Sequence, residues 1–167
     1  MLIIVTSLRQ LDFAQLKDVY EEGNRENGED LYPNLPAGQQ LLQAEQDFYD
    51  YLRAGFFTQP GDRYCLWLVD GRYVSALRLQ RYQDGLLLEA LETHPNYRGR
   101  GYAKALIRAV QETVESEKVY SHISRRNAPS IATHRSCGFR KILDHSVYAD
   151  GSVNPYADTW LYEKPTP

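Results

Sequence analysis

Apolar and polar residues recur along this chain with periods that predict its secondary structure. Near the N-terminus, the β-branched run over residues 2–6 (LIIVT) predicts a strand. Apolar residues then recur at helical spacing over residues 10–22 and again over residues 39–54, which predicts two helices. The segment between them, residues 23–38 (GNRENGEDLYPNLPAG), contains three glycines and two prolines, a composition typical of a loop.

The middle of the chain predicts an antiparallel meander. Strands are expected over residues 63–69, 73–81 and 86–93, separated by the turn signals Asp70-Gly71 and Asp84-Gly85. Pro95 ends the third strand because proline cannot donate a hydrogen bond to a ladder.

The remainder of the chain alternates helices and strands. A helix is expected after Gly101, a strand over residues 119–124, a helix over residues 127–136, and strands over residues 139–148 and 156–163. Asn127 would cap the second of these helices, with Pro129 in its first turn. The element order β-α-α-β-β-β-α-β-α-β-β over residues 1–167 predicts one α/β domain, in which a mixed sheet carries helices on both faces.

Composition narrows the class of protein. The chain has 167 residues, 43% of them hydrophobic and 25% charged, which is typical of a globular domain. Its net charge of −3 disfavours a nucleic-acid partner. We expect no membrane association, because no stretch is long and apolar enough to span a bilayer and the N-terminus lacks the features of a signal peptide. Cys65 and Cys137 are far apart, which disfavours a disulfide framework or a metal site and fits a cytoplasmic location.

Charge is distributed unevenly along the chain. Residues 11–50 contain ten acidic side chains and two basic ones, whereas residues 51–167 contain sixteen basic and twelve acidic side chains. An acidic segment joined to a basic remainder indicates two ligands of opposite charge. The alternative interpretation is that the acidic side chains form a solvated helix face.

Residues 94–110 (HPNYRGRGYAKALIRAV) place two glycines and two arginines at the start of a predicted helix. The N-terminus of a helix has unpaired backbone N–H groups and a positive dipole end, and glycine lets a bulky anion approach the backbone. Arg98, Arg100 and Lys104 add positive charge, so the stretch favours a phosphate or pyrophosphate site. Its spacing matches neither a nucleotide P-loop nor a dinucleotide-binding fingerprint.

Two motifs together resemble those of a known family. Arg98-x-x-Gly101-x-Ala103, which follows a strand and His-Pro-x-Tyr and precedes Leu-Ile, resembles the acetyl-CoA-binding motif of the GCN5-related N-acetyltransferases (GNAT). A second signature of that family is similar to residues 127–139 (NAPSIATHRSCGF), where Asn127, Ser130 and the Gly-Phe pair match. At the position where the family has a tyrosine, this chain has His134.

The resemblance implies a cofactor and its binding residues. In the family, coenzyme A is held through its pyrophosphate by backbone amides of the first motif, and its pantetheine arm pairs with the preceding strand. Carried over to this chain, the first motif gives Arg98, Gly99, Arg100, Gly101, Tyr102, Ala103 and Lys104, and the strand gives Leu91, Glu92 and Thr93. The second signature adds Asn127 and Ser130, which would contact the pantetheine arm.

Acetylation of an amine requires a base and a proton donor for the leaving thiolate. Glu89 is the first candidate base and Glu92 the second, because a carboxylate within an apolar strand has a raised pKa when it is buried. Strand alternation would place Glu89 and Leu91 on one face and Glu92 on the other. Either carboxylate alone could instead face solvent at a sheet edge. His134 is a candidate acid, with packing as its alternative role.

The sequence says least about the amine that accepts the acetyl group. An acidic segment would favour a cationic primary amine, such as a polyamine, an amino sugar, or a lysine or N-terminal amine of a peptide. Two other functions compete with N-acetyltransfer: a non-catalytic acyl-CoA sensor or scaffold of the same fold, and RNA binding by the Arg-Gly stretch, which the acidic composition disfavours. The chain would act as a monomer or a homodimer.

Overall fold

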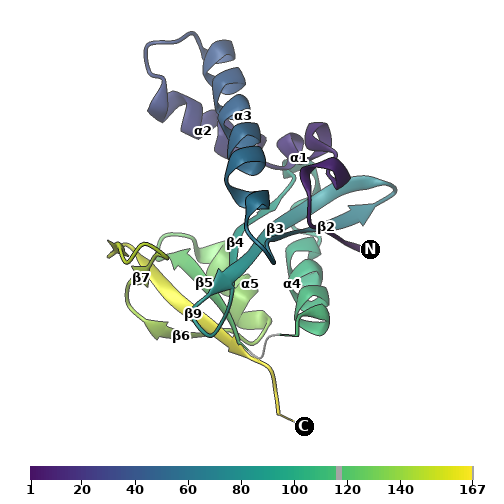
Figure 1. The fold of residues 1–167 in the computed structure, drawn as a ribbon, viewed down its shortest axis with the longest axis vertical. Coiled ribbons are helices and arrows are strands. Elements are labelled where there is room, and N and C mark those ends of the chain that lie inside the picture. Colours follow the sequence, from purple (N-terminus) through teal and green to yellow (C-terminus); the bar gives the residue numbers. More distant parts are fainter. Residues whose placement is uncertain (116–117, 167) are drawn as a thin grey trace.

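The computed structural model describes residues 1–115 and 118–166 (Figure 1). The strands of the described chain are β1 (Leu2–Val5), β2 (Arg63–Val69), β3 (Arg72–Tyr82), β4 (Gly85–Thr93), β5 (Lys118–Ser124), β6 (Arg140–Leu143), β7 (Ser146–Val147), β8 (Val153–Asn154) and β9 (Ala157–Glu163). Its helices are α1 (Phe13–Val19), α2 (Glu21–Leu31), α3 (Ala37–Ala54), α4 (Tyr102–Thr113) and α5 (Ala128–Ser136).

Seven strands form one mixed sheet in the order β1-β2-β3-β4-β5-β9-β6, and β7 pairs with β8 in a separate hairpin. β4 and β5 run parallel, and the other neighbouring strands of the described sheet run antiparallel. The first hairpin turns at Asp70 and Gly71, whose φ angles of 48° and 75° belong to the turn that matches strand twist. The structure confirms the predicted meander, because β2, β3 and β4 match the expected strands to within one residue.

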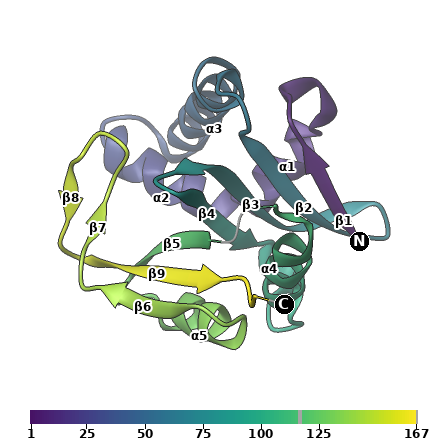
Figure 2. The same cartoon turned by 60° about the horizontal axis from the view of Figure 1, so that its bottom comes forward.

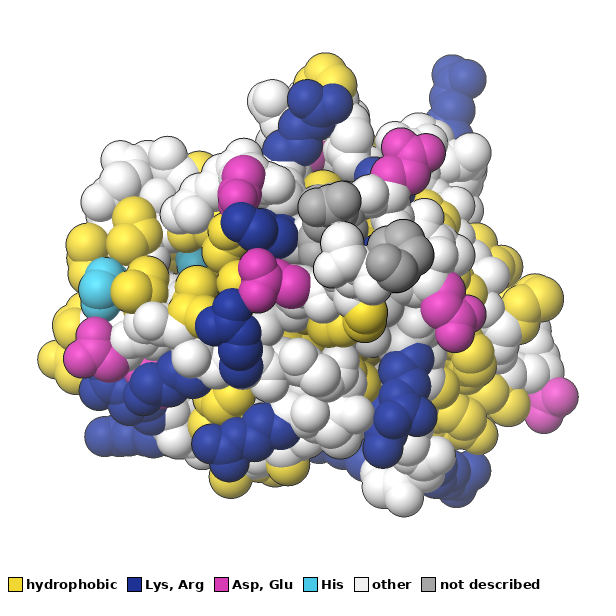
Figure 3. Space-filling model, turned by 90° about the horizontal axis from the view of Figure 1, so that it is seen from below, with side chains coloured by type: hydrophobic (Ala, Val, Ile, Leu, Met, Phe, Trp, Pro, Cys, Tyr) yellow, Lys and Arg dark blue, Asp and Glu magenta, His cyan; other side chains and the backbone are white. Residues whose placement is uncertain are grey.

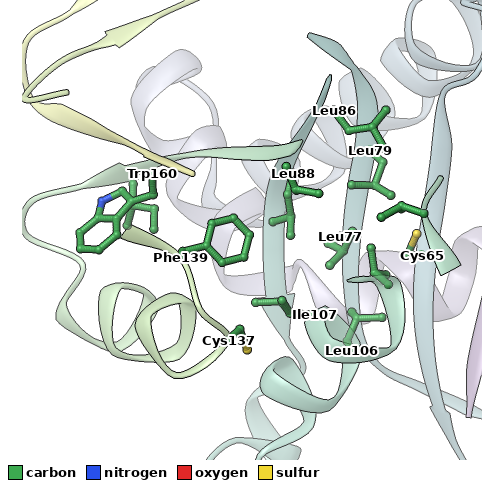
Figure 4. Close-up of a cluster of buried hydrophobic side chains, with 14 residues drawn as sticks. Cys65, Leu77, Leu79, Leu86, Leu88, Leu106, Ile107, Cys137, Phe139 and Trp160 are labelled. Carbon is green, nitrogen blue, oxygen red and sulfur yellow. The ribbon is translucent and has the colours of Figure 1, made fainter. Parts of the chain in front are cut away.

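Helices cover both faces of the sheet, as the element order predicted (Figure 2). On one face, leucines of β3 and β4 pack against Leu106 and Ile107 of α4 in a buried cluster (Figure 4). On the other face, Leu16 of α1 and Leu52 of α3 pack against Tyr64 and other side chains of β2. The two clusters arise because alternate residues of each strand point to opposite faces.

The expected loop over residues 23–38 is wrong in its first part, since residues 21–31 form α2. Acidic residues Glu21 and Glu22 favour a helix N-terminus, and Arg25 forms an ion pair with Glu21 one turn away at 2.6 Å. Gly28 serves packing here: a Cβ atom at this position would lie 2.5 Å from the carbonyl oxygen of Gln40 in α3. The glycine therefore permits close contact between two helices instead of ending one.

The strand expected over residues 139–148 is divided into β6 and β7. The guanidinium of Arg125 accounts for the division, because it donates hydrogen bonds to the carbonyl oxygens of Asp144 and Pro155 and binds the Asp158 carboxylate at 2.8 Å. These contacts hold the chain at the end of β6, so that β7 leaves the sheet and pairs with β8.

The cysteines and the apolar character of the helices were the two remaining features that the sequence singled out. Cys65 and Cys137 are both buried and unpaired with each other. Among the described residues, no helix has both the length and the apolar character that are needed to cross a bilayer.

Candidate active site

The candidate site lies where the two halves of the sheet separate. β4 pairs with β5 only over Leu86–Leu88, opposite residues 119–121. Beyond this point β4 continues to Thr93, while β5 continues beside β9. In the described chain, the edge of residues 89–93 that faces away from β3 has no strand partner. Side chains bind the Ala90 carbonyl and the backbone of Thr93, and the rest of this edge is open to an extended ligand.

β4 contains a bulge at this separation. Arg78 lies opposite Glu89, but Ala76 lies opposite Glu92, so β4 has one more residue than β3 between these pairs. Ala90, within the bulge, has a φ of 52°, which is uncommon for a residue other than glycine. The hydroxyl of Tyr20 donates a 2.6 Å hydrogen bond to the Ala90 carbonyl. Burial raises the pKa of Tyr20 well above its usual value, so the hydroxyl stays protonated as a donor.

The bulge changes the direction of the side chains along β4. The sequence predicted Glu89 and Leu91 on the same face, and this is wrong. Leu91 packs against the cluster that includes Leu88 and α4, whereas Glu89 forms an ion pair with Arg78 at 3.3 Å. One extra residue shifts the strand alternation by one position, and an alanine at positive φ leaves no sign of this in the sequence.

A cavity of about 530 Å³ opens between the end of β4, the loop before α4, the first turn of α4 and one side of α5. Most of the predicted cofactor residues line it: Leu91, Thr93, Arg98, Gly99, Gly101, Tyr102, Ala103, Lys104, Asn127 and Ser130. Glu92 also lines it. Arg100 instead lies over the ring of Tyr97, with its guanidinium carbon 5.4 Å from the ring centre. The structure thus brings together two motifs that are about 25 residues apart in the sequence.

The start of α4 fits a pyrophosphate group. Gly101 is the N-cap, and the first helical hydrogen bond joins the amide of Ala105 to the Gly101 carbonyl at 2.9 Å. The preceding amides therefore have no partner within the helix. Gly99 and Gly101 have φ angles of 74° and 79°, and a Cβ atom on either would meet no atom within 4 Å. The backbone is open to an anion at the positive end of the helix dipole.

The side chain of Arg98 is bound by the protein itself. Its Nε donates to the Thr93 carbonyl at 3.2 Å, while its two terminal nitrogens contact Glu22 at 2.7 Å and Glu92 at 3.1 Å. Arg98 therefore ties the loop to β4 and α2. The positive charge that remains for a phosphate comes from the helix start and from Lys104.

The two candidate bases lie in different surroundings. An oxygen of Glu92 accepts hydrogen bonds from the Thr93 amide and from Arg98, and burial raises the pKa of its carboxyl group. Glu89 precedes the bulge directly and pairs with Arg78.

His134 is buried in the core, with 1% of its surface exposed, and it is not among the residues that line the cavity. Its Nδ1 lies 2.8 Å from the Ser130 carbonyl, which can only accept, so this nitrogen carries the proton. Its Nε2 consequently accepts from the Ser121 hydroxyl at 3.1 Å. Burial lowers the pKa of His134, and the neutral ring uses both nitrogens. This placement favours the packing role over the acid role.

A second cavity, of about 360 Å³, lies between α2, α3 and β4. Its wall includes Tyr20, Tyr64, Arg78 and Ala90. Ala90 lines this cavity and Leu91 lines the first, so the two cavities adjoin at the bulge. Sequence reasoning did not select Arg78, although a charged residue between apolar neighbours in a predicted strand was a usable signal.

Comparisons with known proteins agree with this geometry. The model of the acetyltransferase (GNAT) family matches residues 18–139. A search of curated proteins found no match. Similar solved structures include PaiA N-acetyltransferase from Thermoplasma acidophilum in complex with coenzyme A, with 12% identity, 98% of this chain and 99% of that chain covered, and a TM-score of 0.65. Another is the ribosomal-protein-S18-alanine N-acetyltransferase from Escherichia coli, with 17% identity, 100% of this chain and 96% of that chain covered, and a TM-score of 0.63. A chimera of the spermidine N-acetyltransferase from Vibrio cholerae and hSSAT has 14% identity, covers 97% of this chain and 95% of that chain, and has a TM-score of 0.62. At these identities the structures share the fold.

Proposed function

Because this chain belongs to the GNAT family of acetyltransferases, whose cofactor is acetyl-CoA, we propose that it transfers the acetyl group to a primary amine bound in the cavity beside Arg78. The observation that carries the proposal is the meeting of two cavities at the β4 bulge, where Ala90 faces one and Leu91 the other. A donor and an acceptor bound in these cavities would be brought together at the bulge, which is how an enzyme turns a bimolecular step into an effectively unimolecular one.

The first cavity would hold the cofactor. Acetyl-CoA supplies an activated acetyl thioester when bound. The free amides at the start of α4, with Lys104, would bind the pyrophosphate, and the unpaired edge of β4 would bind the pantetheine arm. Asn127 and Ser130 face the same cavity from α5, in agreement with a contact to that arm.

The amine must lose a proton before it can attack, because an ammonium group has no lone pair. The neutral nitrogen then forms the amide bond as the C–S bond of the thioester breaks, and the coenzyme thiolate takes up the proton that the attacking nitrogen gives up, through the base or water. Glu89 is our first candidate for the base, directly or through water, since it adjoins the bulge and pairs with a residue of the acceptor cavity. Glu92 is the second candidate, because it lines the cofactor cavity and has a raised pKa.

The acceptor would arrive as a cation. α2 and α3, which form one side of the acceptor cavity, contain eight acidic residues and two basic ones. Their field would attract an ammonium group, either of a small molecule or of a peptide. The two unpaired buried cysteines are in keeping with a reducing, cytoplasmic location.

Release of the coenzyme thiol from acetyl-CoA, measured with and without a panel of primary amines, tests the proposal. We expect amine-dependent release, a decrease of about 10²-fold or more in Glu89→Gln, and wild-type rates in Glu112→Gln, which changes an exposed carboxylate of α4. Loss of activity in Glu92→Gln but not in Glu89→Gln would identify Glu92 as the base and exclude Glu89. Binding of coenzyme A without amine-dependent release would contradict acetyl transfer and support the acyl-CoA sensor.

A further inference from the structure

Arg78 is a largely buried cation whose hydrogen-bond donors are not used by the residues that the structure describes. It lies in the middle of β3, and 16% of its side chain is exposed. A guanidinium group has five N–H donors. Within the described part of the chain, its one ion pair is with Glu89, at 3.3 Å from Nε, and neither of these two atoms makes a hydrogen bond.

Aromatic rings hold this guanidinium in place. Its central carbon lies 5.0 Å from the ring centre of Tyr51 and 5.6 Å from that of Phe56. Such contacts stabilise the charge of an arginine. They leave its N–H groups, which lie in the plane of the guanidinium, free to bind other groups. Since Arg78 lines the acceptor cavity, those groups are available to a ligand there.

A further donor without a partner belongs to the wall of the same cavity. Asn24 of α2 is 5% exposed, and its amide nitrogen has no hydrogen-bond partner among the described residues. Buried donors without partners are rare and destabilise a fold, so the donors of Arg78 and Asn24, on two different elements around one cavity, indicate a ligand that accepts hydrogen bonds.

The charges around the cavity agree with this interpretation. Asp47, the acidic residue of its wall, already accepts hydrogen bonds from Tyr32 and Gln43. Asp62 is buried near Arg78 and Glu89, and burial, followed by the charge of Glu89, raises its pKa to about 6. Arg78 is thus the cation of the cavity, with Glu89 as its direct counterion.

From this arrangement we infer that the acceptor is a small amine that also carries a carboxylate, such as a free amino acid, and that Arg78 binds this carboxylate. A carboxylate matches the planar fork of a guanidinium with two parallel hydrogen bonds. The amino group of the same molecule then faces Glu89 and the bulge, where the acetyl group is delivered. A volume of about 360 Å³ is near the lower end of the range of about 300–1,000 Å³ for small-molecule sites. The inference rests on the proposed function, because it names the acceptor class of the same site.

Matched pairs of amines test the inference. Phenylalanine, tyrosine and alanine are compared as acceptors with phenethylamine, tyramine and ethylamine, which lack only the carboxylate, by thiol release from acetyl-CoA. We expect kcat/KM for at least one amino acid to exceed that for its decarboxylated partner by about tenfold or more. Arg78→Met should abolish this preference. Arg81→Met, which changes an exposed arginine of the same strand, should retain it.

A binding measurement covers the case in which Arg78→Met does not fold because Glu89 loses its counterion. The double variant Arg78→Met/Glu89→Gln removes both charges, and its Tm is compared with that of the wild type in the presence of each amine. Amino acids should raise the Tm of the wild type and not that of the double variant, and at equal concentration they should raise it more than the decarboxylated amines do.

The outcomes separate this inference from the proposed function. Equal use of both members of each pair would contradict recognition of a substrate carboxylate by Arg78. It would not contradict the proposed acetyl transfer. Stabilisation by amino acids through Arg78 without any thiol release would support the carboxylate site and contradict the transferase. The absence of both effects would overturn both.

Discussion

At the scale of single residues, the backbone at Gly101 decides whether an anion can reach the start of α4. We predict that Gly101→Val weakens coenzyme A binding by about tenfold or more, a loss of ~1.4 kcal/mol, because the side chain would occupy the open space in front of the amides. Calorimetry or fluorescence titration with coenzyme A measures the affinity. Gly71→Val is the matched control, since Gly71 has a similar φ of 75° and open surroundings in a hairpin turn. If both changes weakened coenzyme A binding equally, the loss of affinity would come from backbone strain and not from a blocked anion site.

The buried imidazole of His134 makes a second prediction at this scale. Its pKa is lowered by burial, so the folded protein binds this proton less readily than the unfolded chain. The stability that it contributes is fully present above pH 6.5 and is lost as the pH falls below that value. We predict that the difference in free energy of unfolding between wild type and His134→Gln decreases from pH 7.5 to pH 5.5, as measured by urea denaturation. A constant difference would contradict a neutral buried ring.

At the scale of elements, the packing of α2 on α3 depends on a glycine. We predict that Gly28→Ala destabilises the fold by about 1–3 kcal/mol, because the added carbon would collide with backbone of Gln40. Gly23→Ala in the same helix meets no atom within 4 Å and should stabilise it by up to about 1 kcal/mol through helix propensity. Denaturant titration of the two variants measures both effects. A neutral Gly28→Ala would contradict the close helix contact.

The bulge of β4 is the second element on which function depends. Tyr20→Phe removes the hydrogen bond that holds the Ala90 carbonyl, and we predict that kcat falls about tenfold while coenzyme A affinity stays nearly unchanged. Steady-state kinetics and coenzyme titration measure the two quantities. Tyr156→Phe, which removes an exposed hydroxyl, is the control. If kcat were unaffected in Tyr20→Phe, the bulge would not require this anchor.

At the scale of the whole molecule, local signals in the sequence accounted for most of the fold. Asp70-Gly71 and Pro95 predicted where strands of the meander end, because turn and breaker residues act over a few positions. α2 was missed because Gly28 resembles a turn residue until its contact with Gln40 is seen. The direction of Leu91 was missed because the bulge depends on a tertiary contact from Tyr20. Such features belong to packing between distant segments, which local periodicity does not record.

The distribution of charge also has meaning at this scale. The face of the molecule seen in Figure 3, from the side of α4 and α5, carries many Lys and Arg side chains. The acidic residues 11–50 lie mostly in α1, α2 and α3, on the other face of the sheet. The sequence predicted two ligands of opposite charge, and the structure adds Arg78 within the acidic half. A zwitterionic acceptor satisfies both observations, since its ammonium group meets the acidic helices and its carboxylate meets the arginine.

The central claim is that the cofactor occupies the cavity between the end of β4 and the start of α4, and leaves the cavity between α2, α3 and β4 to the acceptor. Hydrogen–deuterium exchange with and without coenzyme A tests it most directly. The account predicts slower exchange at the amides of residues 91–93 and 102–104, with α2 and α3 unchanged, because the cofactor would cover the open edge of β4 and the start of α4. Protection confined to α2 and α3, or none in β4, would contradict the claim.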